Sequence, residues 1–366
     1  MCAMFSLVRW FGLLSILALA ACGGTAAPAS SQAAAPAKQR RQPLTPPAKV
    51  HVGANQASSG APLFVADAKG YFKDEGLEVD IAPFANTIEM LPLLTSGQLD
   101  AGGVPPDPST FNAIARGVEL KVVGYYSTTF PGGRALVILV RQDLIDDGRY
   151  KSPRDLKGLN VGVSSTTSSS IFWLNKVMAK DGLTYKDVNL VPVPFPDMIA
   201  AFANKKLDAA VEVQPFALQI ENQKLGQTIF GSGDLVPSGT ANLLLVYGQN
   251  FVQKTPEAAK RYMVAILRAQ RDLWHAFDKG DGDKQEMYQI MSKYTAIKDP
   301  KQNEAVAATG VFSGARPNGD MRLDGLVEVQ DFFVEQGIQT RKIDPASFID
   351  RSFVDYAVQQ LGKIEG

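Results

Sequence analysis

The fold is decided by Glu75-Gly-Leu-Glu-Val-Asp-Ile-Ala-Pro-Phe84. Leu77 to Ile81 alternates apolar and acidic residues, as expected for a strand with one buried face. A helical pattern follows from Ile88 to Leu94, and Leu99-Asp-Ala101 then leads into another strand. This part of the chain therefore predicts a strand, helix and strand in succession.

The same pattern returns later in the sequence. Asp181-Gly-Leu183 precedes Val191-Pro-Val-Pro-Phe195, and Leu207-Asp-Ala-Ala210 follows. Each copy runs strand, Pro-Phe, helix, Leu-Asp-Ala and strand. Two similar units predict an α/β protein with two lobes, each built from parallel strands backed by helices. Chance similarity is the alternative, because strand–helix alternation is common.

Apolar runs and helical spacing predict further elements around these units. We expect strands at Val50–Ala54, Asp100–Val104, Leu120–Gly124, Ala135–Val140, Asn160–Val163 and Leu243–Val246. We expect helices in the last third at Ala258–Phe277, Lys284–Tyr294, Leu326–Gln336 and Phe348–Leu361, with Trp274, Phe332 and Phe333 in the core. One lobe is predicted at 49–140 and 243–366, and the other at 141–242.

The N-terminal residues indicate export. Arg9 precedes a short apolar run, and Leu19-Ala-Ala-Cys22 ends it. This ending resembles the bacterial lipobox, so we expect a signal peptide at 1–21 and a lipid on Cys22. Residues 22–48 are rich in Ala, Pro, Ser and Gln, which predicts a disordered tether. The protein would then sit on the extracytoplasmic face of the cell membrane, and an uncleaved anchor helix is the alternative.

Composition removes several classes of function. The chain has 37 basic and 37 acidic residues and no basic stripe with interleaved aromatics, so we expect no nucleic-acid partner. Its cysteines, Cys2 and Cys22, both fall in the N-terminal segment, which leaves the rest without a disulfide or a thiol nucleophile. His51 and His275 show no metal-ligand spacing. We expect no metal, no cofactor, no catalytic residue and a monomer.

Several motifs between about Lys49 and Leu361 resemble the nitrate/sulfonate/taurine and thiamine-precursor solute-binding family. They are Ala61-Pro-Leu-Phe-Val-Ala66, Lys69-Gly-Tyr-Phe-Lys-Asp-Glu-Gly-Leu77, Ser96-Gly-Gln-Leu-Asp100, Asp155-Leu-Lys-Gly158 and Lys206-Leu-Asp-Ala-Ala210. The resemblance implies a type II periplasmic-binding-protein fold, with two lobes, two crossing strands and a ligand cleft. It also implies delivery of the ligand to the permease and ATPase of an ABC importer.

Two other classes of protein compete with this interpretation. Pyrimidine-precursor synthases resemble this family in fold and use histidine and cysteine, but this chain lacks their cysteine cluster, so we expect no enzyme. An adhesive surface lipoprotein would leave the two-lobed cleft unexplained.

The expected ligand contacts lie in loops that follow strands. Ligands of open α/β sheets bind beyond the carboxyl ends of strands, near helix N-termini. The predicted contacts are Gln56, Ser58, Ser59, Asp107, Tyr125, Tyr126, Ser165, Thr166, Thr167, Trp173, Phe195, Glu212 and Gln214. The run Ser164–Ser170 could equally serve only as a helix cap, and Asp107 and Glu212 could pair with lysine or cap helices instead.

These loops contain neither arginine nor lysine, which small anions usually require. They combine amides and hydroxyls with aromatic side chains, which suits a flat heteroaromatic ring. Within the resemblance, a vitamin-like ligand is implied, and riboflavin is our first choice. A thiamine pyrimidine precursor remains open, as does a sulfonate, taurine or nitrate anion held by helix N-termini.

Overall fold

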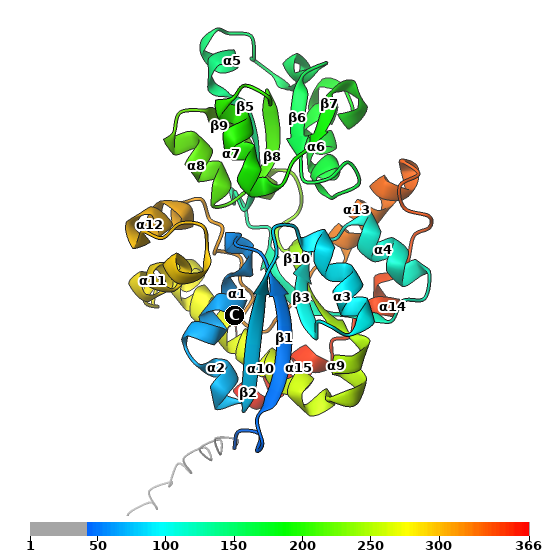
Figure 1. The fold of residues 1–366 in the computed structure, drawn as a ribbon, viewed down its shortest axis with the longest axis vertical. Helices are drawn as coiled ribbons and strands as arrows, with labels where there is room; N and C mark the ends of the chain where they lie inside the picture. The colour runs from blue at the N-terminus through cyan, green and yellow to red at the C-terminus, as the bar shows by residue number, and fades with distance from the viewer. Residues whose placement is uncertain (1–41, 366) are drawn as a thin grey trace, which may run out of the picture. The chain divides into compact units, whose positions relative to one another are not determined.

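Two five-stranded sheets organise residues 42–365, the part of the chain that this computed structural model describes (Figure 1). The first has the order β2-β1-β3-β10-β4 and the second the order β7-β6-β8-β5-β9. The strands are β1 Ala48–Ala54, β2 Leu77–Pro83, β3 Ala101–Val104, β4 Leu120–Thr128, β5 Leu136–Arg141, β6 Asn160–Val163, β7 Asn189–Pro192, β8 Ala209–Val213, β9 Gly226–Gly231 and β10 Ala241–Gly248. The predicted signal peptide and Cys22 lie outside the described residues.

The two sheets share one topology, which confirms the repeat. In both, the first three strands are parallel and the fourth runs antiparallel to its neighbours. The Leu-Asp-Ala motif has the same contacts in each copy. The Asp100 carboxylate accepts from His51 N at 2.8 Å, and the Asp208 carboxylate accepts from Asn160 N at 2.9 Å.

The motif leucine also explains a glycine in each lobe. A Cβ on Gly53 would come within 2.9 Å of Leu99, and one on Gly162 within 2.7 Å of Leu207. Each leucine side chain packs closely over the first strand of its sheet, which only glycine permits.

Two chain segments, 129–135 and 232–240, connect the sheets, and they are hydrogen-bonded to each other. Thr129 N donates to Thr240 O at 2.7 Å, and Gly233 N donates to Gly133 O at 2.9 Å. The strand that we predicted at the end of the first lobe, Ala135–Val140, is β5 and pairs with β8 and β9. The chain therefore passes from the first lobe to the second before this strand, whereas we predicted that it passes after it.

Helices cover both faces of each sheet (Figure 1). They are α1 Ala61–Ala68, α2 Tyr71–Asp74, α3 Met90–Ser96, α4 Pro108–Ala115, α5 Gln142–Asp146, α6 Ser170–Met178, α7 Phe195–Ala203, α8 Phe216–Asn222, α9 Gln249–Lys254, α10 Pro256–Leu273, α11 Lys284–Tyr294, α12 Pro300–Ala308, α13 Asp324–Glu335, α14 Pro345–Phe348 and α15 Ser352–Leu361. A π-helical turn continues α10 to Lys279. Helix α10 and this turn together correspond to the helix predicted at Ala258–Phe277.

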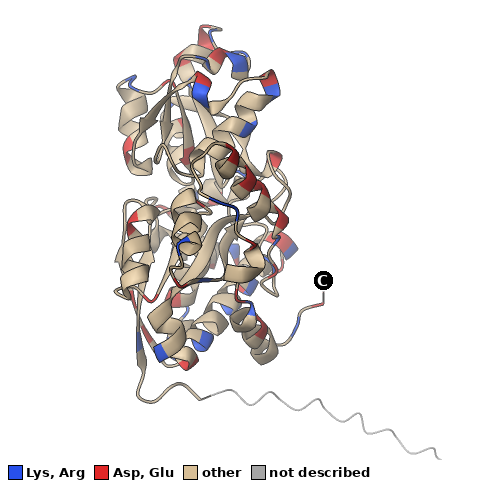
Figure 2. Ribbon diagram, turned by 90° about the vertical axis from the view of Figure 1, so that its right-hand side faces the viewer, with Lys and Arg blue, Asp and Glu red and all other residues tan. Residues whose placement is uncertain are grey.

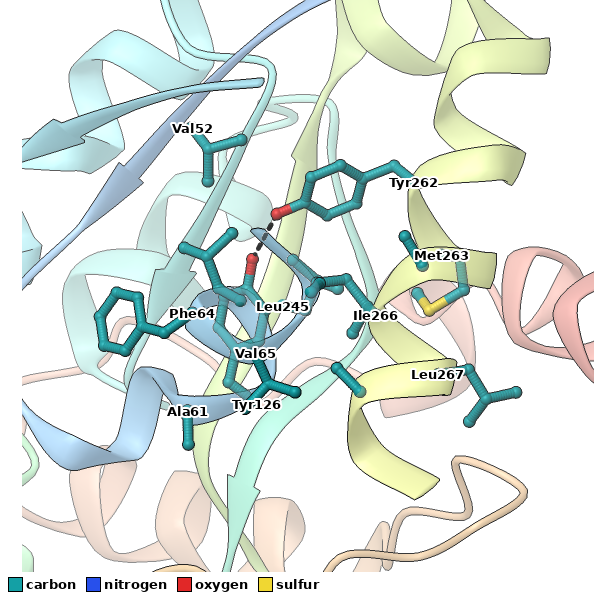
Figure 3. Close-up of a cluster of buried hydrophobic side chains, with 14 of the residues drawn as sticks. Val52, Ala61, Phe64, Val65, Tyr126, Leu245, Tyr262, Met263, Ile266 and Leu267 are labelled. Atoms are coloured by element: carbon teal, nitrogen blue, oxygen red, sulfur yellow. Dashed lines mark hydrogen bonds between the residues drawn. The ribbon is translucent and has the colours of Figure 1, made fainter. Parts of the chain in front are cut away.

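Three clusters of buried apolar side chains hold these layers together. The first lies between the first sheet and α1, α10 and α15, where Figure 3 shows Tyr262 beside Val52 and Leu245. The second includes side chains of both sheets together with α6 and α13, and the third lies under α7 and α8. Phe332 and Phe333 are buried as expected, whereas Trp274 is only half-buried.

The last helices brace both lobes. The rings of Phe332 in α13 and Phe172 in α6 pack edge to face with centroids 5.6 Å apart, and Lys176 pairs with Glu328. Residues 42–48, which we predicted as the end of a disordered tether, instead belong to the ordered first lobe. Leu44 N donates to Glu75 O, and Arg261 donates to the carbonyl of Gln42 at 2.7 Å, so the chain from residue 42 is attached to the first lobe.

Candidate ligand-binding site

A cavity lies between the two sheets, where the carboxyl ends of their parallel strands meet. Its empty volume, including space open to solvent, is about 690 Å³. Polar residues lining it are Asn55, Ser59, Asn86, Thr87, Asp107, Ser164, Ser169, Ser170 and Asn242. Apolar residues lining it are Ala57, Pro105, Pro106, Ala135, Leu136, Trp173, Phe195, Val213 and Leu243.

The cavity lining is almost without charge. It contains no lysine, arginine or histidine, and Asp107 is its only ionisable side chain. The basic and acidic residues, blue and red on the ribbon of Figure 2, are spread over both lobes. An anion in the cavity would meet the Asp107 carboxylate without a cationic side chain to offset it. The lining therefore favours an uncharged ligand with hydrogen-bonding groups.

Asn242 is the side chain most clearly available to a ligand. It lies at the start of β10, where Ala241 pairs with Thr128 and Leu243 already pairs with Ser127. Asn242 is thus the extra residue of a β-bulge, a feature that often redirects a side chain beside a site. Its Nδ2 and Oδ1 are both buried and have no hydrogen-bond partner among the described residues. A ligand with an adjacent donor and acceptor could satisfy both.

Two aromatic rings contribute to the walls of the cavity. Trp173 lies in the first turn of α6 with only 3 % of its surface exposed, and Phe195 begins α7. The ring of Phe172 packs edge to face on Trp173 at a centroid distance of 5.3 Å, which limits its orientation. A planar ligand could therefore contact only the small part of the indole that reaches the cavity.

Asp107 links the two lobes across the cavity. It precedes α4, yet its carboxylate does not cap that helix; it accepts a short hydrogen bond from Ser169 N at the start of α6. Burial raises the pKa of Asp107 from 3.8 to about 6, although the bond from Ser169 opposes this shift. Desolvation therefore disfavours the ionised carboxylate in the folded protein.

This pKa predicts a dependence of stability on pH. Because the folded-state value exceeds the unfolded one, Asp107 contributes stability below pH 4 that is lost as pH rises to about 6. Asp107→Asn keeps an acceptor for Ser169 but cannot titrate. Urea unfolding should show that the wild type loses about 2–3 kcal/mol relative to this variant between pH 4 and pH 7. An equal difference at both pH values would contradict the assignment.

Four predicted contacts line the cavity, namely Ser59, Asp107, Trp173 and Phe195. Gln56 lies nearby at the cleft mouth, beside Phe84. Ser165, Thr166 and Thr167 do not line the cavity, because they form the turn before α6 and Thr166 and Thr167 face solvent. The hydroxyl run still contributes through Ser164, Ser169 and Ser170.

The structure does not bring Tyr125 and Tyr126 to the cavity. The Tyr126 hydroxyl lies 2.7 Å from that of Tyr262 inside the first cluster, as Figure 3 shows. The Tyr125 hydroxyl accepts from Arg316 N at 3.0 Å. Both rings are buried in β4, so neither is placed to stack on a ligand in this cavity.

Ser58, Glu212 and Gln214 are also buried and do not line the cavity. Ser58 N donates to Gln214 O at 3.0 Å, which forms a second link between the lobes. Glu212 is fully buried, with one carboxyl oxygen accepting from Val213 N at 2.8 Å. Burial raises the pKa of Glu212 well above its usual range, because desolvation disfavours the ionised carboxylate.

Sequence reasoning missed the three asparagines of the cavity. Asn55 and Asn86 follow β1 and β2, so the rule that sites lie beyond strand ends could have found both. No such signal pointed to Asn242, because the position of its side chain depends on a bulge formed between two strands far apart in the sequence.

Residues 42–365 contain no group of three or more His, Cys, Asp or Glu placed to hold a metal ion. Within the same range, none of the helices combines the length and apolar character that a membrane crossing needs.

A family model described as the NMT1-like family matches residues 44–292. Among curated proteins, the nitrate/nitrite binding protein NrtA of Nostoc is 25% identical over 311 residues, which cover 81% of this chain and 66% of that protein. The riboflavin-binding protein RibY of Chloroflexus aurantiacus is 24% identical, covering 72% of this chain and 73% of that one. The formylaminopyrimidine-binding protein of Halalkalibacterium halodurans is 32% identical, covering 41% and 42%.

Solved structures show the same fold. The periplasmic nitrate-binding protein NrtA from Synechocystis superposes with a TM-score of 0.72 at 15% identity, covering 86% of this chain and 89% of that one. The alkanesulfonate-binding protein SsuA from Xanthomonas axonopodis superposes with a TM-score of 0.66 at 19% identity, covering 84% and 99%. The predicted fold of a two-lobed periplasmic binding protein is confirmed.

Proposed function

The chain belongs to the NMT1-like family, and from that membership we propose that it is the extracytoplasmic solute-binding protein of an ABC importer. It captures an uncharged, flat heteroaromatic molecule, and riboflavin is the first candidate. The two lobes close over the ligand. The protein acts as a monomer and delivers the ligand to the permease and its ATPase.

The unpaired amide of Asn242 carries this choice of ligand. A pyrimidinedione ring such as that of riboflavin presents an N–H beside a carbonyl, which matches the acceptor and donor of one asparagine side chain. Trp173 supplies an apolar contact for the ring, and serines at and before the start of α6 can donate to hydroxyl groups of a sugar-alcohol chain. The relative named as riboflavin-binding supports the same class.

A thiamine pyrimidine precursor is the second candidate. An aminopyrimidine also presents a donor beside an acceptor, and one relative is named as a formylaminopyrimidine-binding protein. A nitrate, sulfonate or taurine anion is less well matched, because the lining holds a carboxylate and no cationic side chain. A synthase-like enzyme is the least supported, since both cysteines lie before residue 23.

The ligand class is tested by titrating the purified protein with riboflavin and following flavin fluorescence. Stacking on Trp173 should quench the flavin with saturation at one ligand per chain. Fluorescence that stays constant up to millimolar protein would reject riboflavin as the ligand.

The place of the protein in the cell depends on Cys22. We propose that it is lipidated after cleavage at Ala21 and holds the binding domain at the membrane. Cys22→Ala should therefore move the protein from the membrane fraction to the soluble fraction. Continued membrane attachment of an uncleaved Cys22→Ala chain would instead show that the apolar segment is a permanent anchor.

A further inference from the structure

A second hollow adjoins the cavity at the mouth of the cleft, and three phenylalanines surround it. Phe84 follows β2 of the first sheet, whereas Phe195 and Phe216 open α7 and α8 of the second lobe. Its empty volume is about 600 Å³, including space open to solvent. Its lining holds no charged side chain, and its largest apolar side chains are the three phenylalanines.

The internal repeat explains why rings from both lobes meet here. β2 and β7 are the edge strands in the corresponding positions of the two sheets. Phe84 comes directly after β2, with its N–H donating to Ala54 O at 2.8 Å. Phe195 comes three residues after β7. The Pro-Phe element of each repeat therefore brings one ring to each side of the mouth.

The mouth and the inner cavity adjoin each other. Asn55 and Phe195 line both spaces. The inner part offers the amides of Asn55 and Asn242, while the outer part offers the rings of Phe84 and Phe216. A molecule that fills both must be polar along one edge and apolar at the other end.

We infer that Phe84, Phe195 and Phe216 form an outer subsite for the apolar end of an elongated, multi-ring ligand. This inference rests on the proposed function and narrows it. A single pyrimidine ring fills only the inner cavity, whereas a tricyclic ring with the same polar edge reaches the phenylalanines. The subsite thus selects fused ring systems over one-ring precursors.

The test compares lumichrome with lumazine on the purified protein at pH 7. Both carry the same pyrimidinedione edge, but only lumichrome adds a dimethylbenzene ring. The wild type should bind lumichrome about tenfold more tightly than lumazine. Phe84→Ala should lower the affinity for lumichrome about fivefold to tenfold and change the affinity for lumazine less than twofold. Phe84→Leu should recover part of the loss.

Phe230→Ala is the matched control, because Phe230 is half-buried in the second lobe but lines neither space. It should change neither affinity. Equal binding of the two compounds, or an equal loss of both in Phe84→Ala, would overturn the subsite and leave the flavin site intact. Binding of neither compound would overturn the proposed ligand itself and the subsite with it.

Discussion

Replacing Trp173 with leucine should weaken riboflavin binding by on the order of 1–3 kcal/mol, or about tenfold to a hundredfold in Kd, by analogy with bases stacked on aromatic side chains. The indole lines the cavity, and its orientation is limited by Phe172. Leucine keeps the site apolar but removes the flat surface. Flavin fluorescence quenching measures the change.

The control for this substitution is Phe172→Leu. Phe172 is equally buried in α6 and contacts the Trp173 ring, but it does not line the cavity. Both variants lose core packing, so both should unfold at lower urea concentration. Only Trp173→Leu should lose most of the affinity, and Trp173→Phe should retain part of it. Similar affinities for Trp173→Leu and Phe172→Leu would show that the indole does not contact the ligand.

Asn242→Leu should change binding and stability in opposite directions. Both polar atoms of this side chain are buried without a hydrogen-bond partner within residues 42–365, which costs free energy. An apolar side chain of similar size removes that cost, so the variant should resist urea at least as well as the wild type. Riboflavin affinity should fall by on the order of 1–3 kcal/mol, as for a lost bidentate contact to a base edge.

Asn303→Leu provides the matched comparison. Asn303 is a fully buried amide outside the cavity lining, and its Nδ2 donates to Ser292 Oγ at 3.0 Å and to Ile297 O at 3.1 Å, although its Oδ1 has no hydrogen-bond partner among the described residues. Its loss should lower stability and leave affinity unchanged. If Asn242→Leu behaved like Asn303→Leu, with less stability and normal binding, Asn242 would be a structural residue and the ligand orientation proposed here would be wrong.

The fold could be predicted from the repeat because the residues that repeat in the sequence are the ones that make the main contacts in each lobe. Leu99 and Leu207 pack on Gly53 and Gly162, and each following aspartate binds the first strand of its sheet. The apolar spacing of α11 gave its bounds without error, since that helix buries one continuous face. Local pattern and global fold agree in these regions.

The tyrosines show where the local pattern was not enough. We expected β4 to end at Gly124, which would have placed Tyr125 and Tyr126 in a loop at the cleft. The strand continues to Thr128 because β10 pairs along its whole length. Both rings are therefore core side chains. Strand ends depend on the partner strand, which a single sequence does not reveal.

Asn242 illustrates the complementary difficulty. Asn242 is a candidate ligand contact because it lies in a bulge and because its buried amide has no hydrogen-bond partner among the described residues. These features depend on how β10 pairs with β4. The sequence around it, Ala241-Asn-Leu243, predicts only a strand. That ligand contacts lie in the loops after strands stays a prediction, and identifying the side chains of those loops that line the cavity needed the structure.

The central claim, that the cleft binds an uncharged heteroaromatic molecule, is tested most directly by calorimetric titration of the purified protein with a panel of ligands. The panel contains riboflavin, hydroxymethylpyrimidine, nitrate and taurine at the same pH and ionic strength. We expect riboflavin to bind with one site per chain, hydroxymethylpyrimidine to bind more weakly, and both anions to give no heat beyond dilution. Tight binding of nitrate or taurine with no response to riboflavin would contradict the claim and assign the site to helix N-terminal amides.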